Sequence, residues 1–381
     1  MFMWAQIMSG SHDQYWKLAF ASKKVSWKNN LYAIMHVLRK AQKMNNLQTA
    51  IEQKGWLLAD GATGTSLFNM GLEAGEAPEL WNVERPDCVR NLYRESIAAG
   101  VDLFLTNTFG GNSSRLKLHQ AQGRVKELNM AAAELARNEV DLSGQNVLIA
   151  GSMGPTGEIL QPVGSLSEDD AVSIFHEQAE ALKNGGVDFL WVETISSMEE
   201  FRAASKAAAL ADIDWCGTMS FDTAGRTMMG VTSADLAKMV EKLPKAPLAF
   251  GANCGVGASD LLRTILGFAA QGTERPTIAK GNAGIPKFYD GHIHYDGTPD
   301  LMADYAVLAR DCGATIIGGC CGTTPEHLRK MKVALETQPS SKIAPSLETI
   351  AKQLGDFSSL ADGTGEDAPR RERRRERRRV A

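Results

Sequence analysis

Short apolar runs alternate with longer stretches of helical periodicity between residues 55 and 335. The runs hold four to seven residues and are expected to be strands. The stretches between them place apolar residues three and four positions apart, as amphipathic helices do. The predicted strands are 56–59, 101–106, 146–151, 187–193, 214–220, 247–253, 276–281 and 314–319. The predicted helices are 86–99, 124–140, 168–184, 197–210, 233–243, 258–270, 299–311 and 325–335.

This repeated order predicts a single (β/α)8 TIM barrel of the α/β class, because eight strands each followed by a helix can close into a barrel. The active site of such a barrel lies at the carboxyl ends of the strands, called the mouth below. Polar side chains and thiols stand at or just after these ends: Asp60, Asn107, Ser152, Glu193, Cys254, Asn282, Cys320 and Cys321. We therefore expect the chemistry of the protein at the mouth.

The net charge of −4 is unevenly distributed along the chain. Residues 1–43 carry +6 and residues 370–381 also carry +6, so residues 44–369 carry −16. An acidic core argues against nucleic acid as a partner. We expect residues 44–336 to form the barrel and residues 1–43 to be a disordered or non-core basic extension. Residues 337–381 are expected to be a tail that ends in a disordered arginine-rich segment.

Composition also bears on location. No apolar run reaches the roughly 18–20 residues that cross a bilayer, so no membrane association is expected. Six cysteines in a chain of 381 residues do not make a disulfide framework and favour a reducing cytoplasm. The sequence leaves the oligomeric state open, with a homo-oligomer as one alternative.

Three cysteines carry the main chemical signal. Cys320 and Cys321 follow the last predicted strand between glycines, and Cys254 ends another apolar run before a glycine. Neighbouring side chains of a strand point to opposite faces, but the glycines let the backbone bend both sulfurs toward one point. Three thiolates with an open fourth position are typical of catalytic zinc. Buried free cysteines or a disulfide are the alternatives.

Two acids at the mouth narrow the substrate class. Asp60 and Glu193 beside three thiolates would make a strongly anionic pocket unless cations fill it. Zn²⁺ and a substrate ammonium would do so, which predicts an aminothiol acid whose zinc-bound thiolate attacks an activated methyl group. Amides of the glycine-rich loops 59–65 and 151–157 are expected to receive the carboxylate. Trp81 is the best-placed aromatic for a cage around a quaternary ammonium, with plain packing as the alternative.

Several motifs together resemble a known family. They are Asp60-Gly61-Ala62-Thr63-Gly64-Thr65, Thr106-Asn107-Thr108-Phe109, Gly154-Pro155-Thr156, Glu193-Thr194, Gly251-Ala252-Asn253-Cys254 and 318–324. Between about residues 55 and 335 the chain resembles the zinc-dependent homocysteine S-methyltransferases. That family includes betaine–homocysteine methyltransferase and the homocysteine-binding barrel of cobalamin-dependent methionine synthase. The resemblance implies a methyltransferase that binds L-homocysteine.

The resemblance also implies roles for single residues. Zinc would be held by three thiolates, with Asn282 in the fourth position before substrate arrives; the thiolates are those of Cys254, Cys320 and Cys321. The ammonium of homocysteine would be held by Asp60 and Glu193. Amides near Gly61 and Ser152 would take its carboxylate.

The methyl donor is less sharply indicated. Trp81 stands where betaine–homocysteine methyltransferases have a betaine-contacting tryptophan, but Gly110 and Thr194 replace two expected aromatic residues. Asn107-Thr108-Phe109 instead resembles the methionine synthase barrel. We expect a self-sufficient enzyme that uses betaine or a sulfonium such as S-methylmethionine. The alternative is a homocysteine-activating subunit that takes its methyl group from a separate corrinoid protein.

Overall fold

The computed structural model describes residues 46–359, except 223, 286, 290–291 and 342. The chain divides into two compact units, Met1–Thr49 and Ala50–Ala381, and the barrel lies in the second. The predictions for residues 1–43 and for 370–381 therefore lie outside the described residues. No helix in the described part of the chain is both long and apolar enough to span a membrane.

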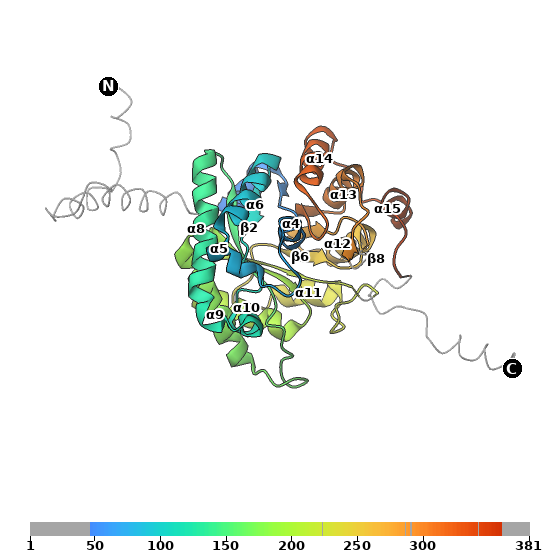
Figure 1. Ribbon diagram of the computed structural model, residues 1–381. Helices are drawn as coiled ribbons and strands as arrows, with labels where there is room; N and C mark the ends of the chain where they lie inside the picture. The colour runs from blue at the N-terminus through green and yellow to red at the C-terminus, as the bar shows by residue number, and fades with distance from the viewer. Residues whose placement is uncertain (1–45, 223, 286, 290–291, 342, 360–381) are drawn as a thin grey trace, which may run out of the picture. The chain divides into compact units, whose positions relative to one another are not determined.

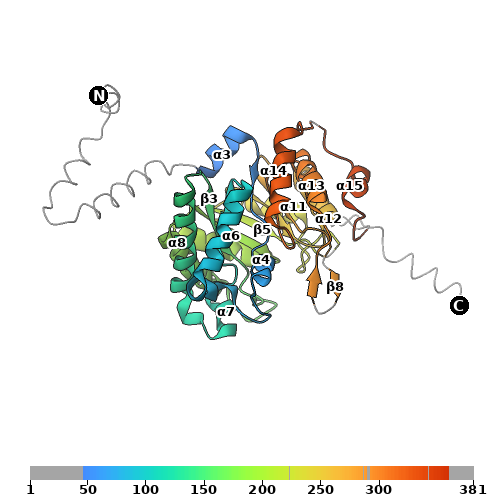
Figure 2. The same ribbon diagram turned by 45° about the horizontal axis from the view of Figure 1, so that its top comes forward.

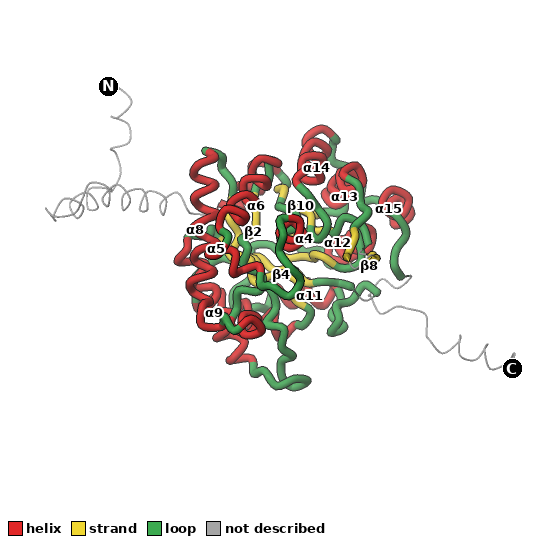
Figure 3. The backbone as a smooth tube through the Cα atoms, in the orientation of Figure 1, coloured by secondary structure: helices red, strands yellow, loops and turns green. Residues whose placement is uncertain are grey.

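Eight parallel strands form one sheet in the order β1-β10-β7-β6-β5-β4-β3-β2. They are β1 (Leu57–Leu58), β2 (Leu103–Leu105), β3 (Leu148–Met153), β4 (Phe189–Ile195), β5 (Trp215–Met219), β6 (Phe250–Cys254), β7 (Thr277–Gly281) and β10 (Ala314–Gly319). Each overlaps one of the predicted apolar runs. Figure 3 shows the strands in yellow surrounded by helices in red. The predicted (β/α)8 barrel is confirmed.

Carboxylates join the first and last strands of the sheet, β1 and β2. The backbone nitrogen of Leu58 donates to Oδ2 of Asp102 at 2.7 Å, and that of Leu105 donates to Oδ2 of Asp60 at 2.8 Å. The backbone nitrogen of Asp102 in turn donates to the carbonyl oxygen of Leu58 at 2.8 Å. One acid near each strand thus takes over part of the pairing that a ladder provides elsewhere. Asp60 therefore belongs to the barrel wall as well as to the mouth.

Each strand is followed by a helix of 8 to 19 residues that packs outside the sheet (Figure 1). These helices are α6 (Pro86–Ala99), α8 (Val125–Ser143), α9 (Glu168–Gly185), α10 (Met198–Leu210), α11 (Ser233–Val240), α12 (Ala258–Ala269), α13 (Pro299–Asp311) and α14 (Pro325–Thr337). Side chains of Ser167, Ser197 and Thr232 cap three of the amino-terminal ends by accepting a backbone N–H. Gly100 and Gly186 end α6 and α9 with positive φ, which glycine adopts at little cost. The eight predicted helices are confirmed to within a few residues.

Several elements lie in segments for which none was predicted: the helices α3 (Asn46–Lys54), α4 (Gly64–Asn69), α5 (Trp81–Glu84) and α7 (Ser113–Leu116), a hairpin and a final helix. A short hairpin of β8 (Lys287–Tyr289) and β9 (His292–His294) follows β7. Helix α15 (Leu347–Leu354) packs against α12 and α13, and Figures 1 and 2 both show it beside them. The chain after α15 is held to α12, since Arg263 donates to the carbonyl oxygen of Ser359 at 2.8 Å. Part of the predicted tail thus packs on the barrel.

Candidate active site

Three thiols meet at the mouth. The sulfurs of Cys254, Cys320 and Cys321 all lie within 4.8 Å of one another, and those of Cys254 and Cys321 are 4.0 Å apart. Zn–S bonds of about 2.3 Å in a tetrahedral site would place two sulfurs about 3.8 Å apart. All six cysteines of the chain are free. The sulfurs are therefore neither scattered nor bridged, and their spacing fits a zinc ion.

The backbone around the cysteines is bent to gather them. Cys254 has a φ of 61°, which is uncommon for a residue with a side chain, and Gly255 follows it with 73°. On the other strand, a Cβ at Gly319 would come within 2.4–2.6 Å of the Thr323 side chain. The cysteine loop can therefore fold back on itself only because glycine stands there. Strain of this kind persists where the surrounding structure enforces it, as at functional sites.

Asn282 ties the two cysteine loops together. Its Nδ2 donates to the carbonyl oxygen of Gly255 at 2.9 Å and lies 3.7 Å from the sulfur of Cys254. Its Oδ1 accepts a hydrogen bond from the backbone nitrogen of Cys321 at 3.0 Å. The amide thus stands beside the thiol cluster and bonds to both cysteine loops.

Asn253 is a second amide at the cluster, and the sequence analysis assigned it no role. Its Oδ1 accepts from the Thr194 backbone nitrogen at 2.9 Å and from Oγ1 of Thr218 at 2.7 Å. Its Nδ2 donates to Oγ1 of Thr194 at 2.8 Å and lies 3.9 Å from the sulfur of Cys320. Thr194 has a φ of 63°, an outlier for a β-branched residue. In the sequence, the available signal for this bracing role was an asparagine in an apolar run, directly before Cys254.

Without a metal the three thiols hold their protons. The hydrogen bond that Cys320 shares with Cys254, and then burial, raise the pKa of Cys320 to about 12. For Cys321 the bond to Cys254 lowers the pKa, but the bond to Cys320 and burial outweigh it and bring the pKa to about 12. For Cys254 the bond to Cys320 lowers the pKa, while the bond to Cys321 and burial raise it to about 11. A cation is needed to turn this cluster into thiolates at neutral pH.

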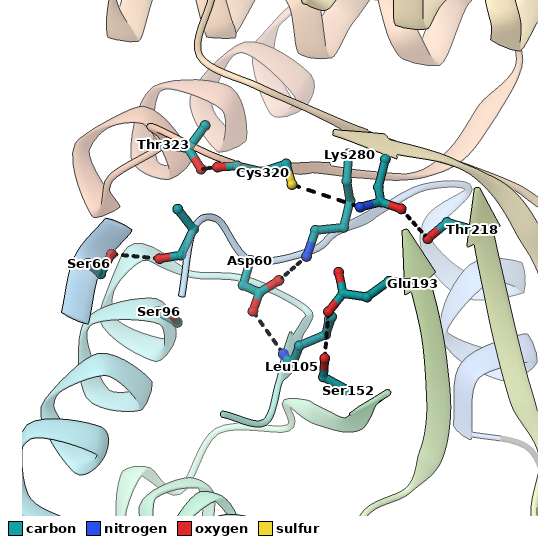
Figure 4. Close-up of polar contacts among 12 residues, drawn as sticks. Asp60, Ser66, Ser96, Leu105, Ser152, Glu193, Thr218, Lys280, Cys320 and Thr323 are labelled. Carbon is teal, nitrogen blue, oxygen red and sulfur yellow. Dashed lines mark hydrogen bonds and ion pairs between the residues drawn. The ribbon is translucent and has the colours of Figure 1, made fainter. Parts of the chain in front are cut away.

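Two carboxylates and a lysine lie below Cys320 in the view of Figure 4. The Nζ atom of Lys280 donates to Oδ1 of Asp60 at 2.5 Å, and both side chains are buried. Figure 4 shows the Glu193 carboxylate on the other side of that ammonium. Lys280 was not predicted, because it precedes the end of its strand, although a lysine within the apolar strand β7 was a visible signal. It fills part of the space assigned to a substrate ammonium.

The charges of this group depend on one another. Burial raises the pKa of Glu193 above its ordinary value, and the charge of Lys280 and a hydrogen bond from Ser152 offset only part of that rise. Burial lowers the pKa of Lys280, but the charges of Asp60, Glu193 and Cys320 outweigh that effect and raise it. Lys280 is therefore a cation at neutral pH.

Ser152 and Gly61 lie where the predicted substrate loops begin. The hydroxyl of Ser152 donates to Oε1 of Glu193 at 2.5 Å and so orients that carboxylate. A Cβ at Gly61 would come within 2.6 Å of Oγ1 of Thr323, so the first loop approaches the cysteine loop closely. Gly61 thus lies next to the cysteine loop, and Ser152 lies next to Glu193.

Trp81 and Asn107 are engaged elsewhere. Trp81 is only 4% exposed, and the guanidinium of Arg85 lies 4.1 Å from the centre of its ring. Nδ2 of Asn107 donates to the carbonyl oxygen of Pro78 at 2.8 Å and to Oδ1 of Asn82 at 3.0 Å. Among the hydrogen bonds of the described residues, neither side chain reaches a cysteine or Glu193. Both organise the loops of the mouth.

Gly110 is one of the two positions where an aromatic residue was expected. Its backbone nitrogen donates to Oε1 of Glu79 at 2.6 Å. A Cβ at Gly110 would lie 3.0 Å from that oxygen, so the buried carboxylate occupies the space of a side chain. Any cage around a cationic donor therefore lacks an aromatic side chain at this position.

Comparisons with known proteins agree with this site. The profile of the family described as homocysteine S-methyltransferase matches residues 57–335. A methionine synthase from Mycobacterium tuberculosis is 28% identical over 314 residues, which are 77% of this chain and 26% of that protein. The chain thus spans about a quarter of the length of this curated relative.

Solved structures show the same fold. The metallated form of the homocysteine methyltransferase MmuM from Escherichia coli has a TM-score of 0.63 at 24% identity, covering 76% of this chain and 99% of that one. Its apo form has a TM-score of 0.60 at 22% identity, with 76% and 100% covered. With the family profile covering most of the barrel, the chain belongs to the homocysteine S-methyltransferase family and is a methyltransferase.

Proposed function

We propose that this enzyme transfers a methyl group to the thiol of L-homocysteine, giving methionine, and that it depends on zinc. The observation that carries the proposal is the convergence of three thiols at the mouth, where Cys254, Cys320 and Cys321 lie within 4.8 Å of one another. These three residues would hold the ion, with Asn282 next to its fourth position. When bound, zinc would hold the homocysteine sulfur as a nucleophilic thiolate.

The remaining mouth residues suit an amino acid. Glu193, oriented by Ser152, is a carboxylate that faces the space below the thiols and can accept the substrate ammonium. Asp60 completes the acidic wall, with both of its oxygens already bonded to Lys280 and Leu105. Amides of the loop after Gly61 and of the loop at Ser152 would receive the carboxylate. In the reaction an S–C bond forms, the bond from the methyl carbon to the donor atom breaks, and the thiol proton leaves to solvent.

For the donor we favour betaine or a sulfonium. A methyl group carried on a cationic nitrogen or sulfur suits a chain whose residues 44–369 carry −16. Loss of the methyl group leaves a neutral amine or thioether, a better leaving group than any neutral precursor would give. Six free cysteines suit a reducing compartment, and we place the enzyme in the cytoplasm.

A separate corrinoid protein is the second candidate donor, and one observation favours it. The loops that follow β2, β3, β5 and β7 expose apolar side chains around the mouth; they are Phe109, Ile159, Val163, Met228, Met229 and Ile285. Exposed apolar side chains around an active site are typical of a protein-docking surface. The buried Trp81 also weakens the case for a betaine cage.

One assay separates the two donors. Zinc-loaded protein is incubated with homocysteine and betaine, or with S-methylmethionine, and methionine is measured. We expect turnover with a small donor. No turnover with either one, followed by turnover when a methylated corrinoid protein is added, would reverse the choice of donor.

A further inference from the structure

The proposed function gives no role to the buried ammonium of Lys280. Lys280 points into the barrel from β7, its side chain is 3% exposed, and its Nζ bonds to Asp60. The ammonium also lies 5.5 Å from the centre of the Trp191 ring. Burying an ammonium is costly unless it is paired, so its position between two acids calls for an explanation.

Asp60 and Glu193 differ in how many of their carboxylate oxygens are already hydrogen-bonded. Oδ1 of Asp60 binds Lys280 and Oδ2 binds the backbone nitrogen of Leu105, so this carboxylate is engaged within the barrel wall. Glu193 has a hydrogen bond from Ser152 and is partly open to solvent. Only Glu193 is therefore arranged to accept a new ammonium.

The charge balance of the three groups also points to Glu193 as the acceptor of a substrate ammonium. With Lys280 present, the pair of acids carries one uncompensated negative charge, which matches the single ammonium of an α-amino acid. Without Lys280, two buried carboxylates of like charge would face each other, and such pairs do not stay fully ionised. A neutral Glu193 would no longer pair with an ammonium.

We propose that Lys280 is a positioning residue for the amino-acid substrate: by neutralising Asp60 inside the barrel, it keeps Glu193 as the single acceptor of the substrate ammonium. The inference rests on the proposed function, because it takes homocysteine as the ligand. It assigns Lys280 no contact with homocysteine and no role in binding zinc.

The test is a set of variants with binding of two ligands measured by calorimetry on the zinc-loaded protein. The ligands are homocysteine and 4-sulfanylbutanoate, which lacks only the ammonium. In Lys280→Met, homocysteine affinity should fall at least about tenfold. This is the usual loss for a charged hydrogen bond, here the one between Glu193 and the substrate ammonium. The affinity for 4-sulfanylbutanoate should change less than about threefold, and zinc content should stay the same.

A second variant guards against a general loss of structure. In the double variant Asp60→Asn with Lys280→Met, the charge that Lys280 neutralises is gone, and the introduced amide oxygen can still accept from the backbone nitrogen of Leu105. Homocysteine affinity should return to within about fivefold of the wild type. An affinity as low as in Lys280→Met alone, or equal losses for both ligands, would overturn the proposal. Failure of the wild-type protein to bind homocysteine would instead contradict the proposed function.

Discussion

The sulfurs of Cys254 and Cys321 lie 4.0 Å apart although 67 residues separate them in the chain. The barrel makes this possible, because β6 and β10 both pair with β7 and end at the same side of the sheet. Strand β7 brings Asn282 between them, where its amide bonds to both cysteine loops. A metal site of this kind depends on the register of three neighbouring strands.

Loss of one sulfur should remove the metal. In Cys321→Ala we expect zinc content and methyl transfer to be lost together, because two thiolates hold the ion poorly. Zinc is measured by elemental analysis after dialysis. Cys312→Ala is the matched control, since Cys312 is a buried cysteine at the end of α13 away from the cluster, and it should retain zinc. Bound zinc and full activity in Cys321→Ala would refute the site.

Glu193→Gln should weaken the binding of homocysteine and leave the binding of zinc unchanged. The neutral amide keeps the shape and can still bond to Ser152, but it loses the charge that attracts an ammonium. We expect the KM for homocysteine to rise about tenfold or more, as for other charged hydrogen bonds, with zinc content unchanged. Glu200→Gln serves as a control, because the buried Glu200 bonds to Thr156 instead. An unchanged KM in Glu193→Gln would exclude Glu193 from the substrate site.

Zinc binding should release protons. The pKa of Cys254 is about 11 and those of Cys320 and Cys321 are about 12, so at neutral pH all three thiols are protonated before the metal binds. Each must lose its proton to become a ligand, so zinc affinity should increase with pH by up to about a thousandfold per unit. Calorimetric titrations of the protein with zinc, in buffers with different ionisation enthalpies, should show the release of about three protons per zinc ion. Affinity that does not change across the neutral pH range would show that the thiols are not the ligands.

The same shifts predict how the metal-free protein responds to base. Below the ordinary cysteine pKa of 9.0 the thiols are protonated in both the folded and the unfolded state. As pH rises from there toward about 12, the unfolded chain loses protons first. The free energy of unfolding should therefore decrease over this range, and urea unfolding below and above pH 9.0 measures it. Zinc-loaded protein should show a smaller decrease, because its thiolates are already formed.

Asn253→Ala should weaken both fold and metal site. The substitution leaves the Thr194 backbone nitrogen and the Thr218 hydroxyl without their partner. We expect the free energy of unfolding to fall by about 2–4 kcal/mol and zinc to dissociate more readily. Thr218→Val removes only one of these bonds and should cost about 1 kcal/mol. Equal stability of the two variants would argue against Asn253 as a brace.

The repeating pattern predicted the barrel because each strand and helix carries its own periodicity. The cysteines could be placed together for the same reason, since all strands of a barrel end at one mouth. Helix α15 was missed because it has only eight residues and is stabilised by packing against α12 and α13. The hairpin was missed because its two strands have only three residues each.

Lys280 and Asn253 show what sequence alone leaves out. Both lie within strands where the pattern predicts apolar residues, and their partners lie far along the chain. Their roles depend on which side chains meet across the barrel interior, and that follows from register. Trp81 is the reverse case: its position in a mouth loop suggested a cage, but Arg85 covers its ring.

The ligand set of zinc tests the central claim most directly. X-ray absorption at the zinc edge should show three sulfurs at about 2.3 Å in the loaded enzyme, and a fourth at the same distance after homocysteine is added. A first shell dominated by nitrogen or oxygen, or a sulfur count that homocysteine leaves unchanged, would contradict a thiol-activating zinc site on Cys254, Cys320 and Cys321.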